Sequence, residues 1–430
     1  MMKAKVITLG CKVNQYESEA MLSSLLKHGF AAAEDKETAD VVILNSCTVT
    51  AESDRKVRQI FRRAKKDNPD AVMVLTGCMA QAFPEDARRL EEADIILGTS
   101  NRKRLVPDLL VFLSARQRII DIAPHTNDEK FENLNVENFT GRTRAFVKIE
   151  DGCNRFCSYC IIPYARGRVR SKPLEDLKAE LAGLGANGYK EVVLTGINLS
   201  AYGQEFGLHL CDAIEAACAT PGIERVRLGS LEPEQLSEDV IRRMAKQKKL
   251  CPQFHLSLQS GCDATLKRMN RHYTADEYRT IVRNLRAAFE NAAITTDIMV
   301  GFAGETDEEF AESLAFAEEI AFAKVHVFAY SRRPGTRAYD MGDQLTNAVK
   351  EARSHEMIRV TTATQQAFFK AQIGRTEEVL FEREIQKGVW EGYSMNYTPV
   401  AVASGTSLAG EIRSVRIESC TDTHCMGAVL

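Results

Sequence analysis

The sequence predicts an α/β protein in three parts: an N-terminal open parallel α/β sheet, a central partial (β/α)6 barrel and a small C-terminal β-barrel. Three observations support this fold class. A chain of 430 residues is too long for one ordinary domain. Short apolar runs rich in β-branched residues alternate with helical patterns as far as about residue 370, as in parallel sheets. After Gly374 the expected strands are short and are separated by glycine and polar turns, which is typical of a small barrel.

The N-terminal part, residues 1–115, alternates short strands with helices. The helices are expected near residues 17–28 and 51–66, and the strands near residues 5–9, 41–44, 72–75 and 95–97. This alternation predicts a parallel sheet. Residues 116–143 contain a short strand near Ile119 and a polar stretch, so we expect a connecting segment there.

The central part, residues 144–372, repeats a strand–helix unit six times. The strands are expected near residues 145–150, 191–195, 225–229, 254–259, 295–300 and 325–330. Their spacing of about 30 to 45 residues suits βα units. Six units indicate an open, partial barrel rather than the complete eight-unit form. A helix from Asn347 to about Lys370 closes this part, and residues 373–430 form the C-terminal barrel.

Cys153, Cys157 and Cys160 form the most informative motif of the chain, C-x3-C-x2-C. Iron–sulfur clusters normally take four cysteines, so three thiolates leave one iron of a 4Fe-4S cluster without a protein ligand. That iron can bind S-adenosylmethionine through its amino and carboxylate groups, and an electron from the cluster then breaks a C–S bond to give a deoxyadenosyl radical. The alternative is a structural zinc site, which requires four ligands, usually in two pairs that are not evident here. The motif therefore predicts radical chemistry on S-adenosylmethionine.

A second group of cysteines follows three strands of the predicted N-terminal sheet. Cys11, Cys47 and Cys78 each lie in a turn context two or three residues after a strand. In an open α/β sheet, sites form outside the carboxyl ends of the strands, so we expect these three thiols to meet at one edge. The alternative reading, small buried hydrophobic residues, would place them inside strands or helices. The pattern favours a second cluster site.

Composition indicates the cellular compartment of the protein and limits the partners that it can bind. Twelve cysteines without a signal peptide indicate a reducing cytoplasm, where thiols serve as ligands rather than as disulfides. No apolar run approaches the roughly 18 residues of a membrane-spanning helix, so we expect a cytoplasmic protein with no membrane partner. The net charge of -3 excludes nucleic-acid binding through the overall field. An RNA partner would need local basic patches.

Together these features resemble the radical-SAM methylthiotransferases, the MiaB/MtaB/RimO family, over essentially the whole chain. That family combines an N-terminal domain carrying three cysteines, a radical-SAM core and a C-terminal TRAM barrel. Within it, the chain is most similar to the branch that acts on threonylcarbamoyladenosine in tRNA. The motifs that carry the resemblance are Thr8-Leu-Gly-Cys-Lys-Val-Asn-Gln-Tyr-Glu17, Asp151-Gly-Cys-Asn-Arg-Phe-Cys-Ser-Tyr-Cys-Ile-Ile-Pro-Tyr-Ala-Arg-Gly167 and Asn270-Arg-His-Tyr-Thr274.

The resemblance implies an enzyme with two 4Fe-4S clusters, one on each cysteine trio, that places a methylthio group on carbon 2 of threonylcarbamoyladenosine at tRNA position 37. The N-terminal cluster would hold the sulfur, and S-adenosylmethionine would serve both as methyl donor and as radical source. The implied partners are the tRNA anticodon stem-loop and an electron donor such as flavodoxin or ferredoxin, and we expect a monomer. Three alternatives stay open: the same chemistry on isopentenyladenosine in tRNA, the same chemistry on a ribosomal-protein aspartate, and a non-catalytic iron–sulfur RNA-binding factor.

Further residues match family motifs that follow the core strands, and the resemblance implies that they contact S-adenosylmethionine. These residues are Tyr159, Gly196, Asn198, Ser230, Glu232 and Gln259. Tyr159 is expected near the adenine. The alternative for the others is turn chemistry, because glycine accepts a positive φ and serine or asparagine caps helices.

Basic residues offer two candidate RNA contacts. Residues 55–66 hold seven basic and no acidic side chains on a predicted helix, although a solvated face explains them equally well. Near the radical motif, Arg166 and Arg168 are expected to meet the threonyl carboxylate of the modified base, because arginine binds carboxylates through two hydrogen bonds.

The C-terminal barrel and the remaining cysteines carry weaker signals. Residues 374–430 contain five Lys or Arg against eight Asp or Glu, so overall repulsion from RNA phosphates is expected. Either Tyr393, Tyr397 and Arg413 supply local contacts, or the barrel contributes shape alone. The other cysteines show no complete ligand set and are expected to pack in the core or near the surface: Cys211, Cys218, Cys251, Cys262, Cys420 and Cys425.

Overall fold

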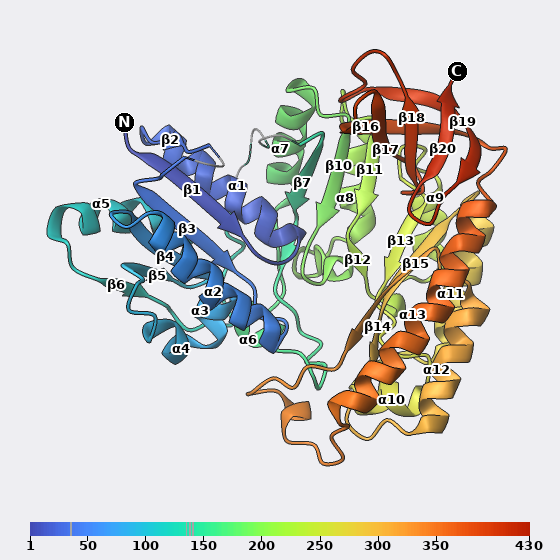
Figure 1. Cartoon of the computed structure of the whole chain (residues 1–430), viewed down its shortest axis with the longest axis horizontal. Coiled ribbons are helices and arrows are strands. Elements are labelled where there is room, and N and C mark those ends of the chain that lie inside the picture. Colours follow the sequence, from blue (N-terminus) through green and yellow to red (C-terminus); the bar gives the residue numbers. More distant parts are fainter. Residues whose placement is uncertain (35–36, 135, 137–138, 140–141) are drawn as a thin grey trace.

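The computed structural model describes the whole chain except residues 35–36, 135, 137–138 and 140–141 (Figure 1). An N-terminal sheet domain, a central domain of βα units and a C-terminal barrel follow one another, which confirms the predicted fold class. The connecting segment expected over residues 116–143 lies partly outside the described residues. Within the described part, no helix is long and apolar enough to cross a membrane.

The N-terminal sheet has six strands, all parallel to their neighbours. The strands are β1 (Lys3–Thr8), β2 (Ala31–Ala32), β3 (Val41–Ser46), β4 (Val72–Gly77), β5 (Ile95–Leu97) and β6 (Ile119–Asp121), in the order β2-β1-β3-β4-β5-β6. The helices are α1 (Lys12–Lys27), α2 (Ala51–Asp67), α3 (Cys78–Ala82), α4 (Pro84–Arg88) and α5 (Leu105–Ala115). Helices α1 and α5 bury one face of the sheet, and α2, α3 and α4 bury the other. The short strand expected in the connecting segment is β6, which completes this sheet.

The central domain is an open barrel of parallel strands. These are β7 (Arg144–Lys148), β10 (Glu191–Thr195), β11 (Arg225–Leu228), β12 (Ser230–Leu231), β13 (Gln253–Leu256), β14 (Ala293–Val300) and β15 (Lys324–Ala329). They form two segments, β11-β10-β7 and β12-β13-β14-β15, joined by a parallel bridge between Val226 and Leu250. The third predicted strand is thus interrupted at Gly229, where the chain passes from one segment to the other.

Helices surround this barrel on the outside. They are α7 (Leu174–Ala186), α8 (Leu210–Ala219), α9 (Glu238–Ala245), α10 (Asp263–Arg268), α11 (Ala275–Ala288), α12 (Asp307–Ile320) and α13 (Asn347–Lys370). Helix α13 packs along β15, as Figure 1 shows. A small antiparallel pair, β8 (Glu150–Asp151) and β9 (Arg170–Ser171), flanks helix α6 (Ile162–Arg166). Short 3-10 turns are η1 (Arg102–Arg104), η2 (Leu199–Ala201), η3 (Gln204–Phe206), η4 (Pro233–Gln235) and η5 (Arg337–Tyr339).

The C-terminal domain is a closed barrel of five strands. They are β16 (Thr376–Gln386), β17 (Val389–Ser394), β18 (Pro399–Ala403), β19 (Ile412–Cys420) and β20 (Cys425–Val429), in the order β16-β17-β18-β20-β19. Neighbours are antiparallel except β18 and β20, which are parallel. The sequence predicts strands near residues 378–381, 390–393, 399–402 and 414–417, which are found as β16, β17, β18 and β19, and it misses β20, whose small residues give a weak strand signal.

Candidate active site

The N-terminal cysteine trio lies at the carboxyl ends of three adjacent strands. Cys11 follows β1 and precedes α1, Cys47 follows β3, and Cys78 follows β4 as the first residue of α3. Their exposure falls in this order: Cys11 is exposed, Cys47 is half-buried and Cys78 is buried. Burial raises the pKa of Cys78 to about 11, and the nearby thiols of Cys47 and Cys11 add to that shift. The three sulfurs therefore line a path from solvent into the domain.

Hydrogen bonds and one close backbone contact hold these three loops together. The Asn14 side chain donates from Nδ2 to the carbonyl oxygens of Leu9 (2.8 Å) and Ser46 (3.0 Å), which joins the loops of Cys11 and Cys47. The Ser46 hydroxyl donates to the carbonyl of Thr76 (2.6 Å) beside the loop of Cys78. Gly77 has φ +97°, and a Cβ there would lie 2.5 Å from the Ser46 carbonyl oxygen. Only glycine fits this turn.

The second cysteine trio lies on the loop between β8 and α6. The Cys160 N–H donates to the Cys157 carbonyl (2.9 Å), so the loop folds back on itself. Asn270 donates to the carbonyl of Phe156 (3.1 Å), and this anchors the loop to the segment after α10. Burial raises the pKa of Cys160 to about 12, and the charge of a Cys157 thiolate raises it further. Of these three cysteines, Cys157 is buried and the other two are half-buried.

In each cysteine trio, one sulfur accepts a hydrogen bond from a buried arginine, and the arginine differs between the two trios. Arg271 donates from Nη1 to the Cys157 sulfur (3.3 Å), and its Nη2 pairs with Glu232 (2.5 Å). Arg166 donates from Nε to the Cys78 sulfur (3.2 Å). Hydrogen bonds to sulfur are one of the ways in which a protein sets the reduction potential of an iron–sulfur cluster.

The donor set at residues 153–160 fits a 4Fe-4S cluster better than a single ion. Among the described residues, no three His, Cys, Asp or Glu side chains are close enough together to hold one metal ion. A cluster of four irons holds its thiolates further apart than one ion does. The loop supplies three free thiols, and Arg271 directs an N–H at one of them. This combination is the ligand chemistry of an iron–sulfur site with one open iron.

Polar groups without partners lie beside the second trio. Oxygen atoms of Glu150 (Oε1), Asn198 (Oδ1) and Gln259 (Oε1) are buried and accept no hydrogen bond in the described part of the chain. The other Glu150 oxygen accepts the Asn198 N–H at 2.7 Å. A Cβ on Gly196 would lie 2.6 Å from the same oxygen, so a larger residue there would displace the Glu150 carboxylate. Buried polar atoms normally have partners, and these orphans therefore indicate a ligand site.

Of the other residues expected around S-adenosylmethionine, some are packed or paired within the protein and one is exposed to the central cavity. Tyr159 packs edge-on against Phe302, with ring centroids 6.3 Å apart. The Glu232 carboxylate is taken by Arg271, whereas Ser230 is exposed to the central cavity. Sequence reasoning missed Glu150 and Arg271, although Arg271 belongs to the quoted motif that begins at Asn270.

A cavity of about 980 Å³ is bounded by all three domains. The N-terminal domain contributes Cys11 and Lys12 to its wall. The central strands and the barrel contribute the remaining wall, including Gly196, Ser230, His255, Asp297, Lys324, His326, Glu391, Tyr393, Tyr397 and His424. Cys11 therefore faces a space large enough for a nucleoside-sized ligand.

Lys12 is exposed within this cavity but surrounded by protein. Burial lowers its pKa to about 8, and the nearby guanidinium groups of Arg144 and Arg227 lower it further. Across the cavity, His255 lies 3.3 Å from a carboxylate oxygen of Asp297. The ring of His326 is 6.1 Å from that of His255. Sequence reasoning missed this group, apart from the place of Lys12 in the motif around Cys11.

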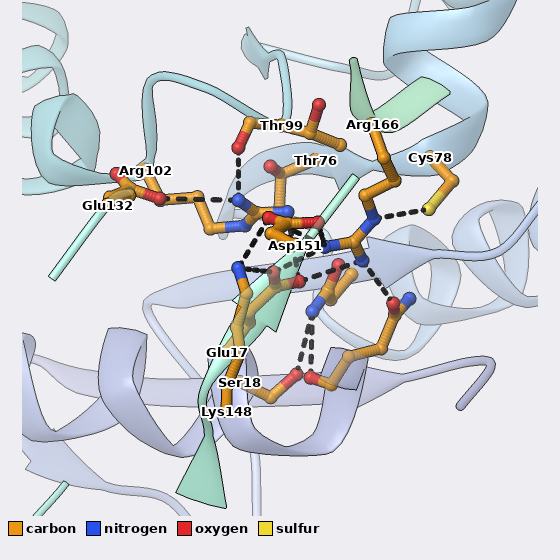
Figure 2. Close-up of polar contacts among 12 residues, drawn as sticks. Glu17, Ser18, Thr76, Cys78, Thr99, Arg102, Glu132, Lys148, Asp151 and Arg166 are labelled. Carbon is orange, nitrogen blue, oxygen red and sulfur yellow. Dashed lines mark hydrogen bonds and ion pairs between the residues drawn. The ribbon is translucent and has the colours of Figure 1, made fainter. Parts of the chain in front are cut away.

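The expectation that Arg166 meets the substrate carboxylate is corrected by its position. Arg166 is 0% exposed, and its guanidinium donates to Glu17 (2.5 Å) and Asn14 (2.6 Å) on α1 as well as to Cys78 (Figure 2). A group so fully bonded has no donor left for a substrate. Arg168 is exposed, packs over the ring of Phe156 at 4.8 Å, and stays a prediction.

Arg166 belongs to a buried ionic network that joins the first two domains (Figure 2). Glu17 pairs with Arg166, with Lys148 (2.7 Å) and with Arg102 (2.9 Å). Asp151 pairs with Lys148 at 2.6 Å. Burial alone would raise the pKa of Glu17, but the three cations lower it to about 2. The carboxylate is therefore held in its charged form.

The barrel tyrosines Tyr393 and Tyr397 lie where the barrel meets the central domain, and their contact with RNA stays a prediction. Tyr393 and Tyr397 stack on one another, with ring centroids 4.6 Å apart. Arg144 and Arg227 of the central domain lie over these rings. The tyrosines thus attach the barrel to the core and line the cavity, whereas Arg413 is exposed and pairs with Glu411.

The remaining basic and thiol groups have ordinary surroundings. On α2, Arg55 pairs with Glu52, Arg62 with Glu92 and Arg63 with Asp67, and all three arginines are exposed. All twelve cysteines are free. Those outside the two trios are buried except for the half-buried Cys420: Cys211, Cys218, Cys251, Cys262, Cys420 and Cys425.

Solved structures with a similar fold contain the same kind of core. The radical S-adenosylmethionine methyltransferase TsrM from Kitasatospora setae matches with a TM-score of 0.59 and 14% identity, over 79% of this chain and 75% of that one. The cobalamin-dependent S-adenosylmethionine radical enzyme OxsB matches with a TM-score of 0.53 and 10% identity, over 85% and 56%. At such low identity these similarities concern the fold.

Comparison at the level of sequence is more specific. The model of "Uncharacterized protein family UPF0004" matches residues 3–98, and that of the "Radical SAM superfamily" matches residues 147–317. The chain is 38% identical to the threonylcarbamoyladenosine tRNA methylthiotransferase MtaB of Thermotoga maritima over 98% of this chain and 96% of that protein. It is 36% identical to the protein of the same name from Bacillus subtilis, over 95% and 92%. It is 35% identical to the tRNA-2-methylthio-N(6)-dimethylallyladenosine synthase of Pelotomaculum thermopropionicum, over 99% and 97%. The chain therefore belongs to the radical-SAM methylthiotransferase family.

Proposed function

We propose that this protein places a methylthio group on carbon 2 of threonylcarbamoyladenosine at position 37 of tRNA. The observation that carries this proposal is the similarity, over nearly the whole chain, to curated enzymes that are named for that substrate. Relatives named for dimethylallyladenosine are almost as similar, so the isopentenyladenosine substrate is the second candidate. The unpaired Lys12 in the central cavity favours the acidic substrate over the apolar one.

In this proposal, Cys153, Cys157 and Cys160 hold a 4Fe-4S cluster with one open iron. When bound, that cluster supplies the electron that releases a deoxyadenosyl radical from S-adenosylmethionine. The chain's own part is to position the cofactor and to keep water away. The buried oxygens of Glu150, Asn198 and Gln259 would accept hydrogen bonds from its amino and hydroxyl groups.

We further propose that Cys11, Cys47 and Cys78 hold a second cluster, which is the source of the transferred sulfur. Support comes from the ends of the three neighbouring strands, where these thiols lie, and from the cross-linked loops that hold them. Cys11 lines the same cavity as Gly196 and Ser230 of the central strands. A base in this cavity would therefore lie between the two parts of the site.

The proposal also covers the electron donor, the cellular compartment and the oligomeric state of the protein. The radical chemistry consumes an electron, which a donor such as flavodoxin or ferredoxin would supply. Twelve free thiols suit a reducing cytoplasm. We also infer that the working unit is a monomer.

The test measures two products in one anaerobic reaction. The wild-type protein is incubated with S-adenosylmethionine, dithionite and an anticodon stem-loop that carries threonylcarbamoyladenosine, and deoxyadenosine and the methylthio nucleoside are measured by mass spectrometry. Cys11→Ala should abolish the methylthio product and retain deoxyadenosine, because only the N-terminal site is damaged. Cys157→Ala should abolish both products.

Parallel substrates separate the alternatives. If the methylthio product forms on an isopentenyladenosine stem-loop and not on the threonylcarbamoyl RNA, the substrate of this enzyme is isopentenyladenosine. Absence of deoxyadenosine with wild-type protein would favour a non-catalytic role. Methylthio product from Cys11→Ala at the wild-type level would contradict the proposed source of sulfur.

A further inference from the structure

We propose that Lys12 binds the carboxylate of the modified base and selects substrates with an acidic side group. This inference rests on the proposed function, because it assigns the part of the substrate that the cavity recognises. Lys12 is the residue next to Cys11 in the chain.

The position of Lys12 suits recognition beside the reacting atom. It directly follows Cys11, and both residues line the central cavity of about 980 Å³. Carbon 2 has to approach the Cys11 side of the cavity to receive sulfur. The threonylcarbamoyl group is attached to the same purine ring, so its carboxylate reaches the wall only a few bond lengths away. A long cationic side chain at position 12 covers that part of the wall.

The ammonium of Lys12 has no hydrogen-bond or ion-pair partner in the described part of the chain, and the carboxylate of Glu191, which acts on it electrostatically, is itself paired with Arg227. This ammonium is exposed inside the cavity. Buried lysines nearby are different: Lys148 pairs with Glu17 and Asp151, and Lys172 pairs with Glu180. An unpaired ammonium inside a cavity, partly surrounded by protein, attracts an anion more strongly than one on an open surface.

The neighbouring arginines strengthen this attraction but cannot replace Lys12. Arg144 pairs with Glu382 at 2.5 Å, and Arg227 pairs with Glu191 at 2.8 Å. Both guanidinium groups also lie over the ring of Tyr397. Their hydrogen-bonding capacity is thus engaged in attaching the barrel, and Lys12 is the cation on this side that remains available.

Lys324 provides a matched control in the wall of the same cavity. It lines the same cavity at the start of β15 and, within the described residues, has no ion-pair partner. It does not adjoin Cys11 and lies beside Asp297 and His326 in the cavity wall. If positive charge anywhere in the cavity were sufficient, replacing Lys324 would have the same effect as replacing Lys12.

An anion at Lys12 could be the carboxylate of the base or a phosphate of the RNA backbone, and three RNAs distinguish them. One stem-loop carries threonylcarbamoyladenosine, the second carries its neutral methyl ester, and the third carries isopentenyladenosine. Dissociation constants are measured by fluorescence anisotropy with reconstituted wild-type protein, Lys12→Gln, Lys12→Arg and Lys324→Gln. Iron content and deoxyadenosine formation are recorded for each variant, so that damage at the adjacent Cys11 site is detected.

Wild-type protein should bind the acid more tightly than the ester. Lys12→Gln should weaken binding of the acid by about tenfold to a hundredfold, as expected for loss of a charged hydrogen bond, and should leave the ester unchanged. Lys12→Arg should retain much of the preference, and Lys324→Gln should retain all of it. Equal weakening of all three RNAs by Lys12→Gln would overturn the proposal in favour of phosphate binding.

Two results separate this inference from the proposed function. If wild-type protein modifies the threonylcarbamoyl RNA but Lys12→Gln keeps its preference for the acid over the ester, the inference fails alone. If wild-type protein modifies only the isopentenyl RNA, the proposed function fails and the inference fails with it.

Discussion

At the scale of single residues, the two cysteine trios share one design: a buried arginine from elsewhere in the chain donates to one sulfur of each. Arg271 reaches Cys157 from the segment after α10, and Arg166 reaches Cys78 from the central domain. A hydrogen bond to sulfur stabilises the reduced, more negative state of a cluster. The two arginines are therefore expected to raise the reduction potentials at their sites.

Arg271→Met should lower the potential of the cluster at residues 153–160, on the order of 50 mV. Arg155→Met is the matched control, because Arg155 is also a cation of this region but its guanidinium pairs with Glu234 (2.7 Å) rather than with a sulfur. The measurement is a redox titration followed by EPR on reconstituted protein. Equal shifts in both variants would mean that charge alone, and not the hydrogen bond to Cys157, sets the potential.

At this scale, a sequence indicates chemistry where the residues that carry it are close together in the chain. Three cysteines within eight residues indicate a cluster loop by themselves. Arg166, in contrast, was expected at the substrate because the sequence reveals only its charge and its distance from the cysteine motif. Its partner Glu17 lies 149 residues away in the sequence. Burial of that pair depends on how two domains meet, which no local pattern encodes.

At the scale of elements, tight turns at strand ends place the N-terminal thiols. Gly77 ends β4 with φ +97° and ψ -164°, a conformation that is essentially restricted to glycine. The missing Cβ also lets the backbone approach the Ser46 carbonyl. The turn thus brings Cys78 beside the loop of Cys47.

Gly77→Ala should destabilise the N-terminal domain by about 3 kcal/mol or more and reduce its iron content. Gly29→Ala is the control, because Gly29 also has a positive φ (+84°) but a Cβ there would meet nothing within 4 Å. That change should cost about 1 kcal/mol and leave the iron content unaltered. Denaturation midpoints and iron assays compare the two. Similar losses in both variants would show that the close approach at Gly77 is unimportant.

Elements were predictable where apolar residues dominate. The runs that became β3 and β4 are entirely buried and were expected. In contrast, β2 consists of two alanines and β20 of small residues with a glycine, so their strand propensities are low. They exist because neighbouring strands offer open edges: β1 pairs with β2, and β18 and β19 pair with β20.

At the scale of the whole molecule, two sets of hydrogen bonds and ion pairs help to hold the N-terminal domain against the central domain. The first is the ionic network of Glu17, Arg166, Lys148, Arg102 and Asp151 (Figure 2). The second is Arg333, which donates to Thr48 and Asp54 on the other side of the cysteine loops. Together they fix how the N-terminal trio faces the central cavity.

Glu17→Gln should destabilise this arrangement by about 3 to 5 kcal/mol, because it leaves buried cations without their counter-charge. The pKa of Glu17 is lowered from 4.5 to about 2. Its contribution to stability is therefore complete above about pH 4.5 and is lost as the pH falls towards 2. Melting temperatures between pH 2 and 7 test both statements.

The exposed Glu52→Gln is the control for this experiment, since Glu52 pairs with Arg55 on the surface of α2. It should leave the melting temperature nearly unchanged. A Glu17→Gln variant as stable as the wild type near pH 7 would show that the network does not hold the domains together. An acid transition of the same size in both proteins would exclude Glu17 as its source.

Iron counting tests the central claim most directly. The claim is that the two three-cysteine sites, one in the N-terminal domain and one in the central domain, each hold a 4Fe-4S cluster. Anaerobically purified protein is analysed for iron and sulfide and by Mössbauer spectroscopy, together with two triple variants in which either trio is replaced by alanine. We predict about eight irons per wild-type chain and about four in each variant. Only about four irons in the wild type, with none lost from the Cys11/Cys47/Cys78 variant, would contradict the account.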